Sequence, residues 1–323
     1  MQVDAGLASP FPRSEELVRA TRDRDRGRTS AAEVERRYRL AEEDVVAEER
    51  RLGFGSVTAG FLRTDDLFRP YALGWEGFAV GPLTRWLESN TFYRRPVLLH
   101  PPARRAGAIR AGLPPPLRAD PAGARLLLPG PYTFAELLDN RSGETGPALV
   151  HRLGRLLADE LRELGGDGFR TFVLSDPLVA IAPPEGPAAA SLEEAYRSIG
   201  GAVPGATTIV WTYGADPVPA LPLLDRLAVT AVGIDLTEVE AERLPQRDRP
   251  AGLAAGVVDP RTTLLEEPTE IVRVVRAAAR RRRADRLWLS TGAPLDLLPA
   301  EAAGRKLGVL AEAARALGGG PGR

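Results

Sequence analysis

The sequence predicts a (β/α)8 TIM barrel. Eight short runs of apolar and β-branched residues are spread along the 323-residue chain, and each has the length of a buried parallel strand. Helical patterns separate most of these runs, which is typical of a parallel sheet covered by helices. Eight strands favour closure into a barrel, for which about 250 residues suffice. We therefore expect a single barrel domain over residues 1–317, followed by a flexible tail at 318–323.

The expected strands cover residues 3–8, 97–100, 125–128, 170–174, 207–212, 231–236, 251–258 and 285–290. Ser30, Thr133 and Ser191 each precede a glutamate by three positions, which is the capping-box pattern that begins a helix. Pro268 and Pro299 stand where a first-turn proline opens a helix, the last one over 300–317.

One connection is far longer than a simple crossover. Residues 13–96 separate the first expected strand from the second, and we treat them as an extended insertion after strand one. Helical patterns begin there at Ser14 and Ser30, and a section rich in glycine and aromatic residues follows at 54–93. A loop of this length is usually functional, so this section is expected to form a hairpin or lid over one end of the barrel.

The composition excludes several classes of protein. The chain has no cysteine and only two histidines, His100 and His151. A disulfide scaffold, an iron–sulfur site and a thiolate nucleophile are therefore excluded, and no metal site is expected. The net charge of zero gives no electrostatic reason to expect nucleic acid or an acidic membrane as partner. No apolar stretch approaches a membrane span and no signal pattern opens the chain, so we expect a cytoplasmic protein.

The working face of such a barrel is the carboxyl end of its strands. Polar residues that follow the expected strands are therefore the site candidates: Arg13, His100, Ser175, Asp176, Tyr213, Asp216, Asp235, Asp259, Arg261, Ser290 and Thr291. We take Asp235, Tyr213 and Asp259 as the candidate catalytic residues. Asp176 and Asp259 each precede a proline, so a role in forming a turn is an equal alternative for both.

The most informative segment, residues 84–96, reads T-R-W-L-E-S-N-T-F-Y-R-R-P. It resembles the T-K-W-F-D-T-N-Y-H-Y-x-x-P stretch in the N-terminal barrel of the cobalamin-independent methionine synthase family, with Trp86, Asn90, Tyr93 and Pro96 identical. Through this resemblance the binding candidates are Thr84, Arg85, Trp86, Asn90 and Tyr93, together with Arg13, Ser175 and Asp176.

Other motifs of that family occur in the same order. They are F-P-R at 11–13, G-P-Y-T at 130–133, S-D-P at 175–177, T-Y-G at 212–214 and G-V-V-D at 256–259, and L-D-L-L-P at 295–299 with Lys306 fits the family's end. The resemblance thus runs from about residue 8 to 316. It implies a barrel of the methionine synthase and uroporphyrinogen decarboxylase-like type.

The departures from the family pattern concern zinc. In the family's catalytic barrel a His-x-Cys pair, a glutamate and a later cysteine hold the metal. Alignment through Tyr213 places these ligands at Val210, Thr212, approximately Asp235, and Ala293. The resemblance therefore implies a barrel without zinc, whereas folate or another methyl donor remains a possible ligand.

Three functions stay open at this point. The first is a non-catalytic partner or substrate-binding subunit, linked to methyl transfer to homocysteine, that assists a separate zinc-bearing methionine synthase barrel. The second is an independent metal-free methyltransferase or lyase of the same barrel superfamily that uses Asp235, Tyr213, Asp259 and Arg13. The third is a relative that only binds a small-molecule ligand.

Overall fold

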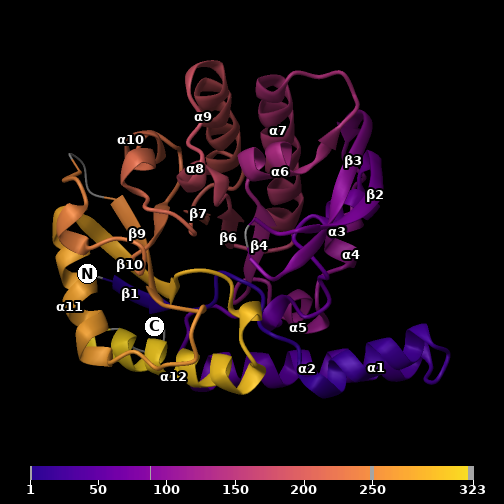
Figure 1. Cartoon of the computed structure of the whole chain (residues 1–323), viewed down its shortest axis with the longest axis horizontal. Helices are drawn as coiled ribbons and strands as arrows, with labels where there is room; N and C mark the ends of the chain where they lie inside the picture. The colour runs from indigo at the N-terminus through magenta and orange to yellow at the C-terminus, as the bar shows by residue number, and fades with distance from the viewer. Residues whose placement is uncertain (1, 88, 248–250, 319–323) are drawn as a thin grey trace.

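A curled sheet of seven parallel strands forms the centre of the computed structural model, which describes residues 2–87, 89–247 and 251–318 (Figure 1). The sheet order is β1-β10-β9-β8-β7-β6-β4. Its strands are β1 (Gln2–Ala5), β4 (Arg125–Pro129), β6 (Thr171–Ser175), β7 (Thr207–Trp211), β8 (Ala231–Asp235), β9 (Ala251–Val258) and β10 (Ala284–Thr291). Seven of the predicted strands are thereby confirmed. Of the predicted tail, residues 319–323 lie outside the described ranges.

The prediction that residues 97–100 form a strand of the barrel is wrong. They belong to β3 (Phe92–Ala103), which pairs antiparallel with β2 (Glu76–Arg85) and parallel with β5 (Asp139–Asn140) in a separate three-stranded sheet. Leu98 is completely buried whereas Leu99 is 43% exposed. A strand of a parallel barrel is buried on both faces, whereas β3 passes from a buried stretch at 96–98 to exposed residues at 99–101.

The two edge strands of the curled sheet are joined by a buried arginine. Arg125 begins β4, and its guanidinium donates to the carbonyl of Leu7 at 3.2 Å and to Asp4 Oδ2 at 3.2 Å, both on the β1 side. Its Nε donates to Ser56 Oγ at 3.0 Å, and Val57 forms an isolated parallel bridge to the residue before β4. Residues 55–57 therefore lie beside β4, where the eighth strand was expected.

Helices cover the outside of this sheet (Figure 1). The longer ones are α1 (Glu15–Asp25), α2 (Ala31–Arg51), α7 (Gly146–Gly166), α9 (Gly186–Gly200), α11 (Pro268–Arg281) and α12 (Ala300–Ala316). The shorter ones are α3 (Arg69–Gly74), α4 (Ala108–Ala111), α5 (Pro115–Ala119), α6 (Pro131–Leu137), α8 (Leu178–Ile181) and α10 (Leu221–Leu224), with 3-10 turns η1 (Ala59–Phe61), η2 (Val218–Ala220), η3 (Ala241–Arg243) and η4 (Leu295–Leu297). None of the described helices is long and apolar enough to cross a membrane.

The predicted helix starts are partly confirmed. Ser14 and Ser30 cap α1 and α2 through their hydroxyls, and Pro268 opens α11. The starts at Thr133 and Ser191 are wrong, because α6 begins at Pro131 and α9 at Gly186, each with a proline in its first turn. A first-turn proline has no amide hydrogen to satisfy and its φ suits a helix, so these helices begin earlier than the hydroxyl residues suggested.

A buried carboxyl group organises the insertion that follows β1. Glu49 of α2 is completely buried and accepts hydrogen bonds from the Thr58 amide at 2.8 Å, the Thr58 hydroxyl at 2.8 Å and the Ala59 amide at 3.3 Å. Burial raises the pKa of Glu49 to about 7. The residue therefore holds the start of η1, and with it the loop that follows, against α2.

Candidate active-site mouth

A cavity of about 360 Å³ opens at the carboxyl ends of the parallel strands. Its walls come from residues 8–13 after β1, from the ends of β4, β6 and β7, and from the loop after β10. The insertion adds residues from 61–67 and 86–93. Segments far apart in the sequence thus meet at the end of the sheet where barrels of this class carry their sites.

Tyr213 is part of the wall of this cavity. It is buried, and its Oη is 3.5 Å from Ser175 Oγ. Burial raises the pKa of Tyr213 well above its usual range, and the nearby Asp296 charge adds to this, while the side chains of Ser175 and Trp86 oppose it. The phenol therefore keeps its proton at neutral pH and offers a ligand a hydrogen-bond donor, not a base. The predicted candidates Tyr213 and Ser175 both line the cavity.

Sequence reasoning missed Asp296, which lies in η4 after β10 and lines the same cavity. The residue is exposed, and partial desolvation of its carboxyl group by the surrounding protein raises the pKa to about 6. Among the described residues, the backbone amide of Asp296 itself is the one hydrogen-bond donor that lowers this pKa. A polar residue in the loop after the last strand is the signal that could have identified it.

Arg13 lines the cavity, but its charge is already matched. Its Nε donates to the Leu62 carbonyl at 2.7 Å, and its Nη2 contacts Asp65 Oδ1 at 3.0 Å. The guanidinium also lies 5.7 Å from the centre of the Tyr38 ring. Arg13, predicted as a binding residue, therefore connects the segment after β1 to the insertion.

Two of the aromatic candidates from the 84–96 segment reach the cavity. Trp86 and Tyr93 both line it, with ring centres 5.5 Å apart and nearly perpendicular planes. Phe68 packs against both rings at 5.5 Å. Tyr93 is buried and donates its hydroxyl hydrogen to the Leu137 carbonyl at 2.9 Å. Trp86 and Tyr93 therefore both pack in the aromatic cluster and form part of the cavity wall.

The polar candidates of this segment lie elsewhere. Arg85 and Asn90 are exposed and Thr84 is half-buried, and none of the three is among the described residues that line the cavity. Thr84 and Arg85 end β2, paired with β3. The side chains of Thr84 and Arg85 therefore lie on the surface of the β2–β3 hairpin, outside the cavity.

Asp176 is completely buried and occupied by structural contacts. Its carboxyl oxygens accept the amide of Thr133 at 2.6 Å, the amide of Tyr132 at 3.4 Å and the hydroxyl of Tyr196 at 3.0 Å. The first two amides belong to the first turn of α6, whose own N-cap, Gly130, has no side chain to offer. Burial raises the pKa of Asp176 to about 6, although the hydrogen bonds that its carboxylate accepts lower the pKa in part. The arrangement is that of a helix cap supplied by another element.

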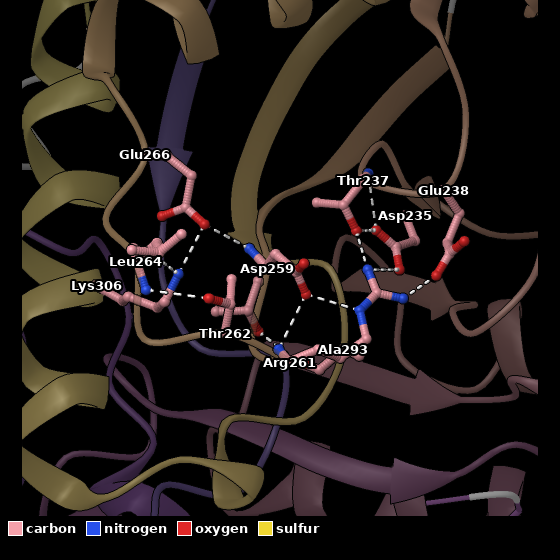
Figure 2. Close-up of polar contacts among 11 residues, drawn as sticks. Asp235, Thr237, Glu238, Asp259, Arg261, Thr262, Leu264, Glu266, Ala293 and Lys306 are labelled. Carbon is pink, nitrogen blue, oxygen red and sulfur yellow. Dashed lines mark hydrogen bonds and ion pairs between the residues drawn. The ribbon is translucent and has the colours of Figure 1, made fainter.

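The candidates Asp235 and Asp259 meet around an arginine instead of the cavity (Figure 2). Asp235, at the end of β8, is buried, and its Oδ1 accepts the hydroxyl of Thr237 at 2.5 Å. Arg261 places Nη2 3.9 Å from Asp235 Oδ2, Nε 2.7 Å from Asp259 Oδ1 and Nη1 against Glu238. One guanidinium therefore faces three carboxylates.

This cluster continues to the chain's single lysine. Lys306 of α12 is completely buried, and its Nζ donates to Glu266 Oε1 at 2.7 Å and to the Leu264 carbonyl at 2.6 Å. The same Glu266 oxygen accepts the backbone amide of Asp259 at 2.8 Å. Figure 2 shows this connected set, from Glu238 and Asp235 through Arg261 and Asp259 to Glu266 and Lys306. Burial raises the pKa of Asp235 above its usual range, and its Oδ2 receives no hydrogen bond from the described residues.

The residues at the positions of the zinc ligands do not fit zinc. Val210 is buried in the apolar core, Thr212 donates its hydroxyl hydrogen to the Gly233 carbonyl at 2.8 Å, and Ala293 offers only a methyl group. Beside the remaining position, Asp235, lies the guanidinium of Arg261. Within the described ranges, no group of three or more His, Cys, Asp or Glu side chains is arranged to hold a metal ion. This donor set is not one that zinc selects.

Comparisons with known proteins agree with this fold. Residues 54–282 match the family model described as "Cobalamin-independent synthase, N-terminal domain". The chain is 30% identical over 286 residues to the 5-methyltetrahydropteroyltriglutamate–homocysteine methyltransferase of Mycobacterium tuberculosis, covering 76% of this chain and 36% of that protein. It is 22% identical over 314 residues to a methionine synthase of Sulfurisphaera tokodaii, covering 92% and 87% of the two chains.

Solved structures show the same architecture. A putative vitamin-B12 independent methionine synthase from Listeria monocytogenes superimposes with a TM-score of 0.74 at 15% identity, covering 98% of this chain and 99% of that one. A B12-independent methionine synthase from Shewanella sp. W3-18-1, in complex with selenomethionine, gives 0.64 at 16% identity, covering 98% and 97%. The chain spans little more than a third of the mycobacterial relative. Since the family model covers more than half of the chain, this protein belongs to the cobalamin-independent synthase family and resembles its N-terminal domain.

Proposed function

We propose that this chain is a ligand-binding barrel of methionine synthase type that assists methyl transfer to homocysteine and leaves activation of the thiol to a separate zinc-bearing barrel. The relatives' names supply the reaction class, methyl transfer to homocysteine. The observation that carries the proposal is the guanidinium of Arg261, 3.9 Å from Asp235, at about the position where the resemblance places one of the family's zinc ligands. A thiol needs such a metal, or a neighbouring base, to become a strong nucleophile at neutral pH.

The cavity supports the binding half of this proposal. Its volume of about 360 Å³ lies in the range of small-molecule sites. Aromatic walls give it apolar contact area, and Tyr213 and Ser175 add hydroxyl groups that can orient a ligand. In this role the chain contributes a methyl-donor site, and the partner contributes the metal.

We also infer that the curled sheet is the barrel of this family, completed in its eighth position by residues 55–57. The Gly55 amide donates to Asp4 Oδ1 at 2.9 Å, and Val57 bridges to the start of β4. The contacts of Arg125 to Leu7 and Asp4 support the same closure.

The alternative of a metal-free methyltransferase or lyase needs Asp235, Tyr213, Asp259 and Arg13 around one substrate. Tyr213 and Arg13 line the cavity, whereas Asp235 and Asp259 face Arg261. The geometry therefore favours binding over this alternative chemistry.

The test measures methyl transfer to homocysteine with 5-methyltetrahydrofolate and with methylcobalamin, together with metal content. We expect no stoichiometric zinc and no turnover by the chain alone. Addition of the zinc-bearing barrel recovered with it from native extract should produce turnover that depends on both proteins. Turnover by the purified chain alone, or one tightly bound zinc per chain, would overturn the proposal. A partner whose activity is unchanged by this chain would leave only the third function, ligand binding without catalysis.

A further inference from the structure

The cavity at the mouth has an aromatic wall. Seven of its described lining residues are aromatic, among them Trp86, Trp211 and Tyr213. Trp211 and Tyr213 contact each other with ring centres 4.9 Å apart, and Trp86 packs against Tyr93 on the insertion side. The faces of aromatic rings carry negative electrostatic potential. Ring faces turned toward the cavity would therefore favour a cation over an anion.

The charged residues that line the cavity also favour a cationic ligand. They are one arginine, Arg13, and three aspartates, Asp65, Asp66 and Asp296. Arg13 is paired with Asp65 at 3.0 Å. Asp66 is paired with Arg69 at 3.0 Å and also accepts the backbone amides of residues 68, 69 and 94. Asp296 is left as the carboxylate with no ion pair among the described residues. The cavity thus has one uncompensated negative charge.

An anionic ligand would be poorly matched in this cavity. It would bring a second negative charge toward Asp296, and the only arginine in the described wall is engaged by the Leu62 carbonyl and Asp65. A primary ammonium group would need several hydrogen-bond acceptors to replace its water, and besides Asp296 the described wall offers it mainly the hydroxyls of Ser9, Thr64, Thr91 and Ser175. A charge covered by methyl groups needs no such acceptors and is recognised by aromatic faces.

We propose that this cavity binds a small organic cation whose charge is covered by methyl groups, a quaternary ammonium or a sulfonium, with Asp296 as its counter-ion and the rings of Trp86, Trp211 and Tyr213 as its walls. The inference rests on the proposed function only in taking the cavity as the ligand site. It narrows the class of methyl donor from any methyl compound to a cationic one.

The experiment is calorimetric titration of the full chain with choline, with trimethylsulfonium and with 3,3-dimethyl-1-butanol, the neutral isostere of choline. We expect both cations to bind at least about tenfold more tightly than the neutral isostere. Asp296→Asn should weaken choline binding by about tenfold or more and leave binding of the isostere unchanged. Asp159→Asn, which changes an exposed aspartate of α7, is the matched control and should bind choline as the wild type does.

A second variant tests the wall. Trp86→Leu keeps an apolar side chain but removes the ring, and it should weaken cation binding more than binding of the neutral isostere. Thermal melting of each variant establishes that it is folded. Equal binding of choline and its isostere, unchanged affinity in Asp296→Asn, or no binding of either cation by the folded wild type would overturn the inference.

The outcomes also separate this inference from the proposed function. Binding of 5-methyltetrahydrofolate in the absence of cation binding would refute the cationic ligand and leave the partner role standing. Cation binding that follows Asp296, with a zinc-bearing barrel whose turnover does not depend on this chain, would refute the partner role and leave the cation site standing.

Discussion

Arg261 Nη2 lies 3.9 Å from Asp235 Oδ2, so the positive charge beside this buried carboxyl group belongs to a side chain of the same domain. Arg261 also contacts Asp259 and Glu238, and it is partly exposed. We expect Arg261→Ala to lower the free energy of unfolding by about 1–2 kcal/mol, between the values for exposed and for buried ion pairs.

The loss in Arg261→Ala should depend on pH. Burial already raises the pKa of Asp235, and Arg261 opposes this. Without the arginine the folded-state pKa rises further, so folding with an ionised Asp235 becomes less favourable at pH values above its unfolded-state pKa. Urea unfolding should show a larger deficit at pH 8 than at pH 5. Arg273→Ala, which removes an exposed pair with Glu270, is the control. A deficit that is larger at pH 5 would contradict the assignment.

Replacing Asp176 tests whether this residue stabilises the fold or binds a ligand. We expect Asp176→Ala to destabilise the fold by about 2–4 kcal/mol, because two amides of α6 and the Tyr196 hydroxyl lose a buried acceptor. Asp176→Asn keeps one carbonyl oxygen and should cost less. Chemical denaturation measures both variants. If the folded Asp176→Asn lost ligand affinity while its stability stayed that of the wild type, Asp176 would instead belong to the binding site.

Glu49 should give the stability curve a measurable slope. Its folded-state pKa is about 7 because of burial, whereas an unfolded glutamate titrates near about 4.3. Between these values the folded state binds more protons, so stability falls as pH rises through this window. Glu49→Gln should flatten the curve between pH 5 and 7 in urea unfolding. Glu48→Gln, on the same helix and exposed, should leave the slope unchanged; equal slopes in all three proteins would refute the role of Glu49.

Trp86 and Asn90 share a motif but should behave differently when replaced. Trp86 packs against Phe68 and Tyr93 and lines the cavity, so Trp86→Ala should cost about 2 kcal/mol of stability and most of the ligand affinity. Asn90 is exposed, and Asn90→Ala should change stability by less than about 0.5 kcal/mol. Melting curves and ligand titration distinguish the two. Loss of affinity in Asn90→Ala would place a ligand outside the cavity described above.

The sequence pattern predicted seven strands of the curled sheet because short apolar runs, such as the fully buried Ala231–Asp235 of β8, are typical of parallel strands. It failed at residues 97–100, since an apolar run does not say which strand it pairs with. The site residues that the sequence predicted correctly are those that directly follow a strand. Tyr213 and Ser175 follow their strands directly, whereas Asp296 reaches the cavity from a loop. The pairing of Arg13 with Asp65, 52 residues apart, depends on tertiary contacts that no local motif encodes.

The position of Lys306 has a practical consequence for the bench. It is the chain's one lysine, and its ammonium group is buried against Glu266 and the Leu264 carbonyl. An amine-directed acylating reagent can therefore modify this side chain only in molecules in which Lys306 has separated from Glu266 and from the loop that carries Leu264. The acylated fraction of the peptide that contains Lys306, followed over time, therefore measures the rate at which these contacts open in the native protein. Crosslinkers aimed at lysine will for the same reason miss the surfaces of this protein, and carboxylate-directed chemistry is the better choice for mapping its partners.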